Sequence, residues 1–136
     1  MSNSIATGVA YADPEFITCY ATQEIGYSTA AQGAVTQATD KGTGVTLNKS
    51  VGRITMNNAA LAGGAVASFM LTNSLISTND TIIVCVSSNT TGSAAGAYTA
   101  YVSYLSAGTA LISLRNLSGT SYSEAVIINY AIIHGQ

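Results

Sequence analysis

The chain has 136 residues, of which 48% are hydrophobic and only 7% are charged. This length suits one domain with one core, and the low charge excludes charge-rich disorder, coiled coils and long solvated helices. The net charge is -2 at pH 7, and neither sign forms a run. A nucleic-acid-binding protein needs a basic stripe to displace counterions, so we expect no nucleic-acid partner.

The sequence also argues against a membrane partner, although its mean hydropathy is +0.35. The longest apolar stretch, residues 125–133, is about half as long as a membrane-spanning helix. No Lys or Arg precedes Lys41, and no continuous apolar block lies near the start of the chain. We therefore expect no secretory signal and a chain made in the cytoplasm.

Residues 1–32 differ from the rest of the chain because they show no sustained hydrophobic periodicity. They hold three of the six acidic residues and the only proline. We predict an extended N-terminal arm over residues 1–32, followed by one β domain over residues 33–136. The arm is too short to bury its own large side chains, so we expect it to bind a partner through Tyr11, Phe16, Ile17, Tyr20, Ile25 and Tyr27.

After Gly33, short runs rich in Val, Ile, Thr and Tyr alternate with clusters of Gly, Asn and Ser, which is typical of strands and turns. Between the third and fourth runs, residues 57–64 suit either a single helical turn or a loop. Eight short strands predict an all-β fold, a single antiparallel β-sandwich with jelly-roll connectivity favoured. The expected strands are residues 35–38, 45–48, 51–56, 65–72, 81–87, 97–105, 109–117 and 125–133.

Two of these strands carry particular expectations. Residues 125–133 are apolar on both faces, so this strand should be central in its sheet or covered by a partner chain. In residues 97–105, period-two alternation places Tyr98, Val102 and Tyr104 on one side and Tyr101 on the other. Because tyrosine is enriched at protein interfaces, Tyr98, Tyr101 and Tyr104 are candidates for an oligomer or ligand surface, with ordinary core packing as the alternative.

The inventory of reactive side chains is small. The only histidine, His134, lies in a C-terminal tail that we expect to be frayed. Cys19 and Cys85 lie far apart and are expected to be buried free thiols that stay reduced. These residues do not supply a catalytic constellation or a zinc tetrahedron. We therefore predict no catalytic residue, no cofactor, no metal site and no enzymatic activity.

Four segments carry a resemblance to a known group of proteins. They are GAVTQATDKGTGVTLNKSVGRITM at residues 33–56, LTNSLI at 71–76, LRNLSG at 114–119 and SEAVIINYAII at 123–133. In this order they resemble the β domain of small virion proteins of tailed bacteriophages, over about three quarters of the chain. That family includes capsid decoration, or cement, proteins and domains of tail or head fibres.

The resemblance implies a structural role on the virion, at the capsid surface, for a protein made in the host cytoplasm. The first expectation is a decoration protein that forms a homo-oligomer, a dimer or a trimer, and clamps neighbouring copies of the major capsid protein. The alternative is a fibre domain that recognises host surface glycan through tyrosines and the polar loop at residues 89–96. Size favours the first, because the chain has no heptads and no collagen-like repeat for a stalk.

Overall fold

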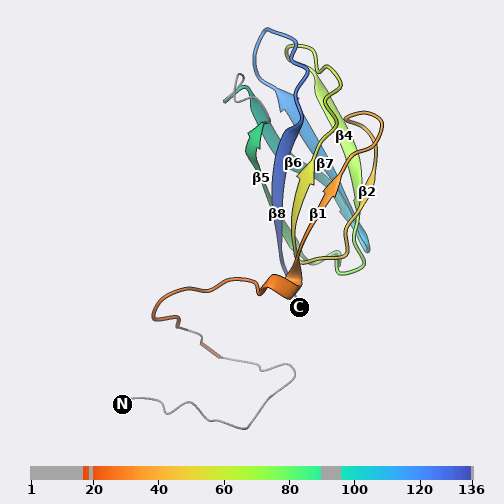
Figure 1. Cartoon of the computed structure of the whole chain (residues 1–136). Helices are drawn as coiled ribbons and strands as arrows, with labels where there is room; N and C mark the ends of the chain where they lie inside the picture. Colours follow the sequence, from red (N-terminus) through yellow and green to blue (C-terminus); the bar gives the residue numbers. More distant parts are fainter. Residues whose placement is uncertain (1–16, 19, 90–95, 136) are drawn as a thin grey trace.

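The computed structural model describes residues 17–18, 20–89 and 96–135, which form two β-sheets packed face to face (Figure 1). The all-β sandwich expected from the sequence is confirmed, and each predicted strand overlaps an observed one. A short 3-10 helix, η1 (Thr29–Ala31), precedes the first strand. The strands are β1 Gln32–Thr36, β2 Val45–Thr46, β3 Val51–Thr55, β4 Val66–Thr72, β5 Thr81–Asn89, β6 Tyr98–Ser106, β7 Thr109–Asn116 and β8 Val126–Ile133.

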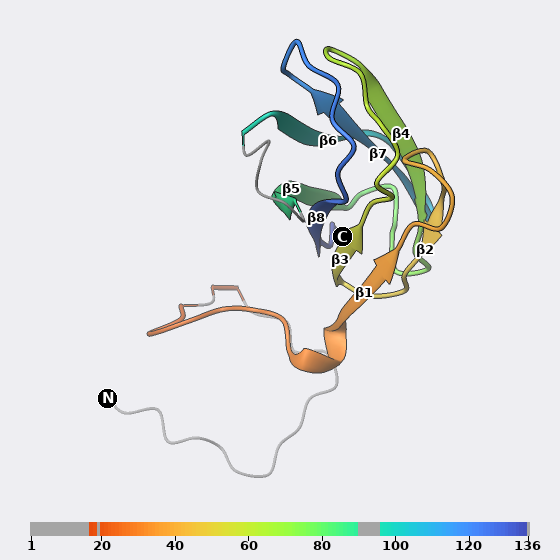
Figure 2. The same cartoon turned by 45° about the horizontal axis from the view of Figure 1, so that its top comes forward.

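The strand order is β1-β3-β8-β5 in the first sheet and β2-β4-β7-β6 in the second, and Figure 2 shows the two layers apart. The expectation of a purely antiparallel sandwich is wrong, because β1 runs parallel to β3 and β2 runs parallel to β4. Strands β1 to β4 alternate between the two sheets, so each parallel pair, β1 with β3 and β2 with β4, is joined through one strand of the other sheet. The alternation of apolar and polar residues within a strand does not show whether that strand runs parallel or antiparallel to its neighbour. The observed order does not confirm jelly-roll connectivity.

The core lies between the sheets and follows from period-two alternation. Inward-facing side chains that are fully or almost fully buried come from both layers, and each contributes about 1.5–3 kcal/mol relative to an exposed position. From the first sheet they are Ile54, Val126, Ile128, Tyr130 and Ile132, and from the second they are Phe69, Leu71, Ile112 and Leu114.

Strand β8 is central, as its two apolar faces predict. It pairs with β3 on one side and β5 on the other, so both of its edges are hydrogen-bonded. Ile127, on the outer face, is also buried, between the paired residues Thr55 and Ser88. The segment between β3 and β4 is a loop and not a helical turn, and it forms one bridge from Leu61 to Tyr122.

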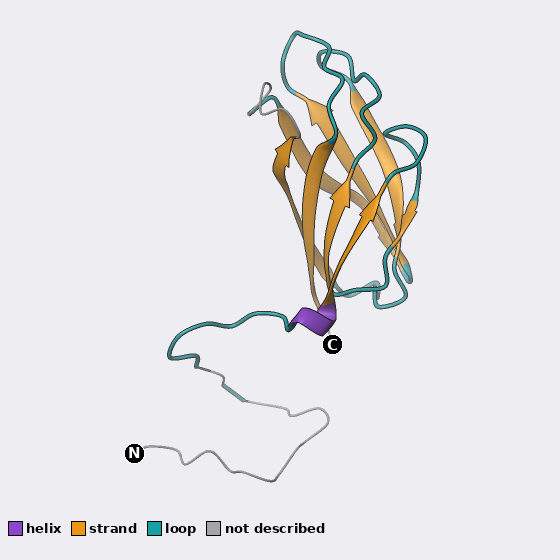
Figure 3. Ribbon diagram, in the orientation of Figure 1, coloured by secondary structure: helices purple, strands orange, loops and turns teal. Residues whose placement is uncertain are grey.

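The arm enters the sandwich at the end of the molecule where β8 finishes (Figure 3). Its described residues lead away from both sheets, and η1 joins them to β1. Strand β1 begins at Gln32, one residue before the glycine at which the composition changes. Among residues 17–18, 20–89 and 96–135, no helix is long and apolar enough to span a membrane.

Candidate functional site

The arm exposes the apolar side chains that its sequence singles out. Ile17, Tyr20 and Ile25 are all more than three-quarters exposed. Tyr11 and Phe16, the other candidates in this segment, lie outside the described residues. Large apolar side chains displayed together on an extended segment are typical of a segment that becomes buried against a partner.

Tyr27 differs from Ile17, Tyr20 and Ile25 because its side chain is hydrogen-bonded to the sandwich of its own chain. Its hydroxyl donates a hydrogen bond to the carbonyl oxygen of Ile132 at the end of β8. Lys49 Nζ donates to the carbonyl oxygen of Ala30 at 2.8 Å, which holds η1 in place. The arm is therefore fastened near its base, and residues before Tyr27 extend from a fixed point.

The three strand tyrosines do not form one surface. Tyr98 is buried in the core, whereas Tyr101 and Tyr104 are exposed. The expectation that Tyr104 shares a side with Tyr98 is wrong, because a β-bulge between Val102 and Tyr104 shifts the alternation by one residue. Tyr104 consequently faces outward, and the next residue, Leu105, packs against the core.

The outer face of the second sheet, here called the tyrosine face, carries several apolar side chains among serine and threonine residues. The register places Tyr104, Leu111 and Met70 in one row across three strands. In the neighbouring row, Ser113 Oγ lies 2.7 Å from Ser68 Oγ. The residues that define the face are Val66, Met70, Tyr101, Tyr104, Leu111 and Arg115, of which only Arg115 is charged.

The outer face of the first sheet, here called the arginine face, combines apolar and polar groups. The register forms one row of Cys85, Asn129, Arg53 and Ala34 and a second row of Ile83, Ala131, Val51 and Gln32. Between these rows lies a shallow pocket of about 220 Å³ lined by Gln32, Gly33, Val51, Gly52, Arg53 and Asn129. The sequence did not single out Arg53 or Asn129, since each is an isolated polar residue within an apolar strand.

Cys85 lies on this face and is an exposed free thiol. The expectation that this thiol is buried is wrong, because the alternation of β5 turns Ile82, Val84 and Val86 inward and Cys85 outward. Cys19 lies outside the described residues.

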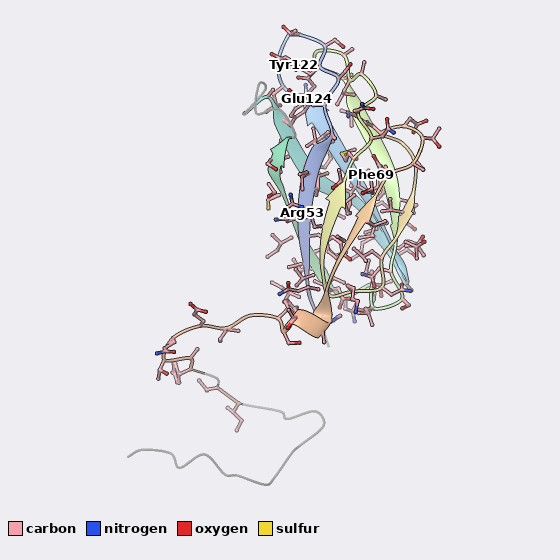
Figure 4. The ribbon with its side chains drawn as sticks, viewed as in Figure 1. Arg53, Phe69, Tyr122 and Glu124 are labelled. Atoms are coloured by element: carbon pink, nitrogen blue, oxygen red, sulfur yellow. The ribbon has the colours of Figure 1, made fainter. Side chains whose placement is uncertain are left out.

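A buried polar cluster occupies the end of the sandwich opposite the arm, and Figure 4 shows Glu124 and Tyr122 there. Lys41 and Glu124 are both buried, and Lys41 Nζ donates to the carbonyl oxygens of Asn57 and Glu124, the latter at 2.6 Å. Burial lowers the pKa of Lys41, and the Glu124 charge partly opposes that effect. Burial and then the Glu124 charge raise the pKa of the neighbouring Tyr98 to about 12.

This cluster joins the loop at Lys41 to the start of β8. Gln37 continues it, since its side-chain amide donates to the carbonyl oxygens of Lys41 and Thr43 and accepts from the backbone N–H of Asn57. The side chains of Lys41 and Gln37 satisfy backbone atoms of the connecting loops, which is a structural role. The sequence contains no spacing signal that would have paired Lys41 with Glu124.

The C-terminal tail is held in place, contrary to the expectation that it frays. His134 Nδ1 lies 3.2 Å from Asp80 Oδ2, and the Gly135 N–H donates to Asp80 Oδ1 at 3.1 Å. The Ser77 N–H also donates to this carboxylate, and it is the largest of the contacts that lower the pKa of Asp80 to about 2. The part of the chain that the structure describes contains no cluster of three potential metal ligands.

No family model matches the chain, and no curated protein or solved structure matches it either.

Proposed function

We propose that this chain is a virion structural protein of a tailed bacteriophage, a decoration protein that forms a homo-oligomer and clamps neighbouring major capsid subunits. The observation that carries the proposal is a sandwich with a complete core joined to an arm that exposes Ile17, Tyr20 and Ile25. A domain that folds independently while displaying apolar residues on an extension is suited to binding a preformed surface. The segments at residues 33–56 and 123–133 supply the resemblance to the phage family.

The free energy of burying apolar surface favours the arm residues before Tyr27 as the segment that attaches to the capsid. Burial of apolar surface contributes about 25 cal/mol per Å², less the entropy lost by each ordered residue. The arm is fastened at Tyr27, so only the residues before it need to become ordered on the capsid. Few charged groups are available, so high salt should weaken the complex little.

The test is binding to capsids that have been assembled without this protein. A variant lacking residues 1–20 removes Tyr11, Phe16, Ile17 and Tyr20 and keeps the contact of Tyr27 with Ile132. We expect this variant to stay folded by circular dichroism and to lose capsid binding, measured by co-sedimentation. Full occupancy of capsid sites by the truncated protein would overturn the arm attachment.

The alternative, a fibre domain that binds host glycan, has one observation in its favour. Tyr101 and Tyr104 are exposed side by side on β6, and aromatic rings on a surface can stack on sugars. The matched variant is Tyr101→Ser with Tyr104→Ser, which leaves the core unchanged. Loss of binding to host cells in this variant, together with no capsid binding by the intact protein, would favour the fibre role.

A further inference from the structure

The pocket on the arginine face contains polar groups that the rest of the described chain does not satisfy. Asn129 Oδ1 is buried and has no hydrogen-bond partner among the described residues. Arg53 lies directly opposite Asn129 in the register, is exposed, and has no ion pair with any described carboxylate. A buried acceptor without a donor is costly, so a ligand that supplies an N–H group would be stabilised here.

The pocket is an open space between two rows of side chains, here called the slot. It lies between Arg53 and Asn129 in one row and Val51 and Gln32 in the other, and Ala131 and Ile83 continue the second row beyond the pocket lining. An extended segment places consecutive side chains on opposite sides and its N–H groups at right angles to them. Such a segment laid in the slot would present one side chain to Arg53, the next to the apolar row, and an N–H to Asn129.

Charge distribution identifies which segment fits. Residues 1–32 carry three acidic residues and no basic residue, a net charge of -3, whereas residues 33–136 carry four bases and three acids, a net charge of +1. Within the described arm, Glu24 is the acidic residue, and it is followed directly by the exposed Ile25. The pair Glu24-Ile25 offers a carboxylate and an apolar side chain on opposite sides of an extended backbone.

We propose that the segment around Glu24 and Ile25 of one copy binds the arginine face of a second copy. The Glu24 carboxylate accepts hydrogen bonds from Arg53, a backbone N–H of the segment donates to Asn129 Oδ1, and Ile25 packs on the row of Ile83, Ala131 and Val51. Ile25 lies two residues before Tyr27, where the arm is fastened to its own sandwich, so the segment projects from that point and is exposed to a neighbouring molecule. This contact deepens the homo-oligomer of the proposed function, and it does not depend on capsid binding because self-association is measured on the free protein.

The test reverses the two charges separately and then combines the variants. Glu24→Arg and Arg53→Glu each place like charges together, so we expect each to weaken self-association by about tenfold or more. Self-association is measured on the free, full-length protein by sedimentation velocity over a range of concentrations. Arg115→Glu makes the same charge change on the tyrosine face and should leave association unchanged; a loss there in place of one at Arg53 would assign the contact to the tyrosine face and overturn the proposal.

Mixing the two variants distinguishes a contact between copies from one within a chain. In a mixed dimer both contacts become complementary, and in a ring of three two of the three contacts do. Restored association on mixing would support the proposal. If the mixture of the two single variants does not associate but the double variant Glu24→Arg/Arg53→Glu does, the arm binds its own chain and the proposal is wrong.

Two further results would also overturn the proposal. One is wild-type protein that stays monomeric at all concentrations, and the other is unchanged association in the Arg53→Glu variant. Thermal denaturation checks that the variants are folded. Because Arg53 and Glu24 are exposed, the midpoints of the variants should stay close to that of the wild type.

Discussion

Tyrosine and isoleucine have opposite surroundings in the arm and in the sandwich. Tyr20 is 90% exposed and Ile25 is 77% exposed, whereas Tyr130 is 2% exposed and Ile132 is fully buried. The difference does not lie in residue type but in pairing, because β8 has a hydrogen-bonded strand on each side and a second sheet over its inner face. An apolar side chain thus stabilises this protein only where neighbouring strands enclose it.

The largest difference between the two regions should appear when one aromatic ring is removed from each. Phe69→Ala leaves a cavity at the centre of the core and should lower the free energy of unfolding by about 3–5 kcal/mol. Tyr20→Ala should change it by less than about 0.5 kcal/mol. Urea unfolding of both variants tests the comparison, and a large loss from Tyr20→Ala would mean that the arm packs on the sandwich.

A second prediction concerns how tightly the core is filled around Tyr130. A Cβ atom added at Gly52 would lie 2.1 Å from Tyr130 Cε1, and the ring cannot move away because its hydroxyl is hydrogen-bonded. Gly52→Ala should therefore lower stability by about 1–3 kcal/mol. Its register partner Gly33 is the control, since a Cβ there meets only the flexible side chains of Leu47 and Lys49. Equal losses in the two variants would contradict this account.

A third prediction isolates one hydroxyl group in the core. Tyr130 Oη lies 3.1 Å from the Leu47 carbonyl oxygen and 3.0 Å from the Lys49 carbonyl oxygen, and it accepts from Asn73 Nδ2. Tyr130→Phe leaves these buried groups short of a partner and should cost about 1–2 kcal/mol in chemical denaturation. Tyr104→Phe, on the exposed face, should be nearly neutral. A neutral Tyr130→Phe would show that water replaces the hydroxyl.

The smallest effect on stability is expected at the C-terminal tail. This tail is hydrogen-bonded to Asp80, whereas the described arm residues before Tyr27 extend away from the sandwich. The Ser77 N–H and the other donors hold the pKa of Asp80 at about 2, below the ordinary value of 3.8. The contribution of Asp80 is therefore complete above about pH 4 and is lost as the pH falls towards 2. Asp80→Asn should flatten the decline of the thermal midpoint over that range.

His134 provides a second measurement at the same tail. Its side chain is half exposed beside Asp80, so His134→Ala should lower stability by less than about 1 kcal/mol. A larger loss would mean that the tail contributes to the core.

The sequence was sufficient to find the strands because their signal is local. Alternation in residues 65–72, 81–87 and 109–117 located three of the strands, and the two-faced pattern of residues 125–133 predicted a central strand. The prediction failed at Tyr104, where one bulged residue reverses the alternation. It also failed for strand direction, since β1 and β2 each form a parallel pair.

The arm candidates could be recognised from composition, whereas the pocket on the arginine face could not. Ile17, Tyr20 and Ile25 stand out because they are large apolar residues in a segment without periodicity. Arg53 and Asn129 are 76 positions apart in the chain and meet only because β3 pairs with β8 in one register. Lys41 and Glu124 likewise come together through the loops that close the sandwich.

Properties that depend on neighbouring residues along the chain were therefore present in the amino-acid sequence: strand positions, the alternation of side chains within a regular strand, and the contrast between arm and sandwich. Properties that depend on long-range pairing required the folded structure. These include the strand order, the burial of Tyr98 apart from Tyr104, and the opposition of Arg53 to Asn129. The physical reason is that side-chain alternation is set by backbone geometry within one strand, whereas register and order are set by how two sheets share a single core.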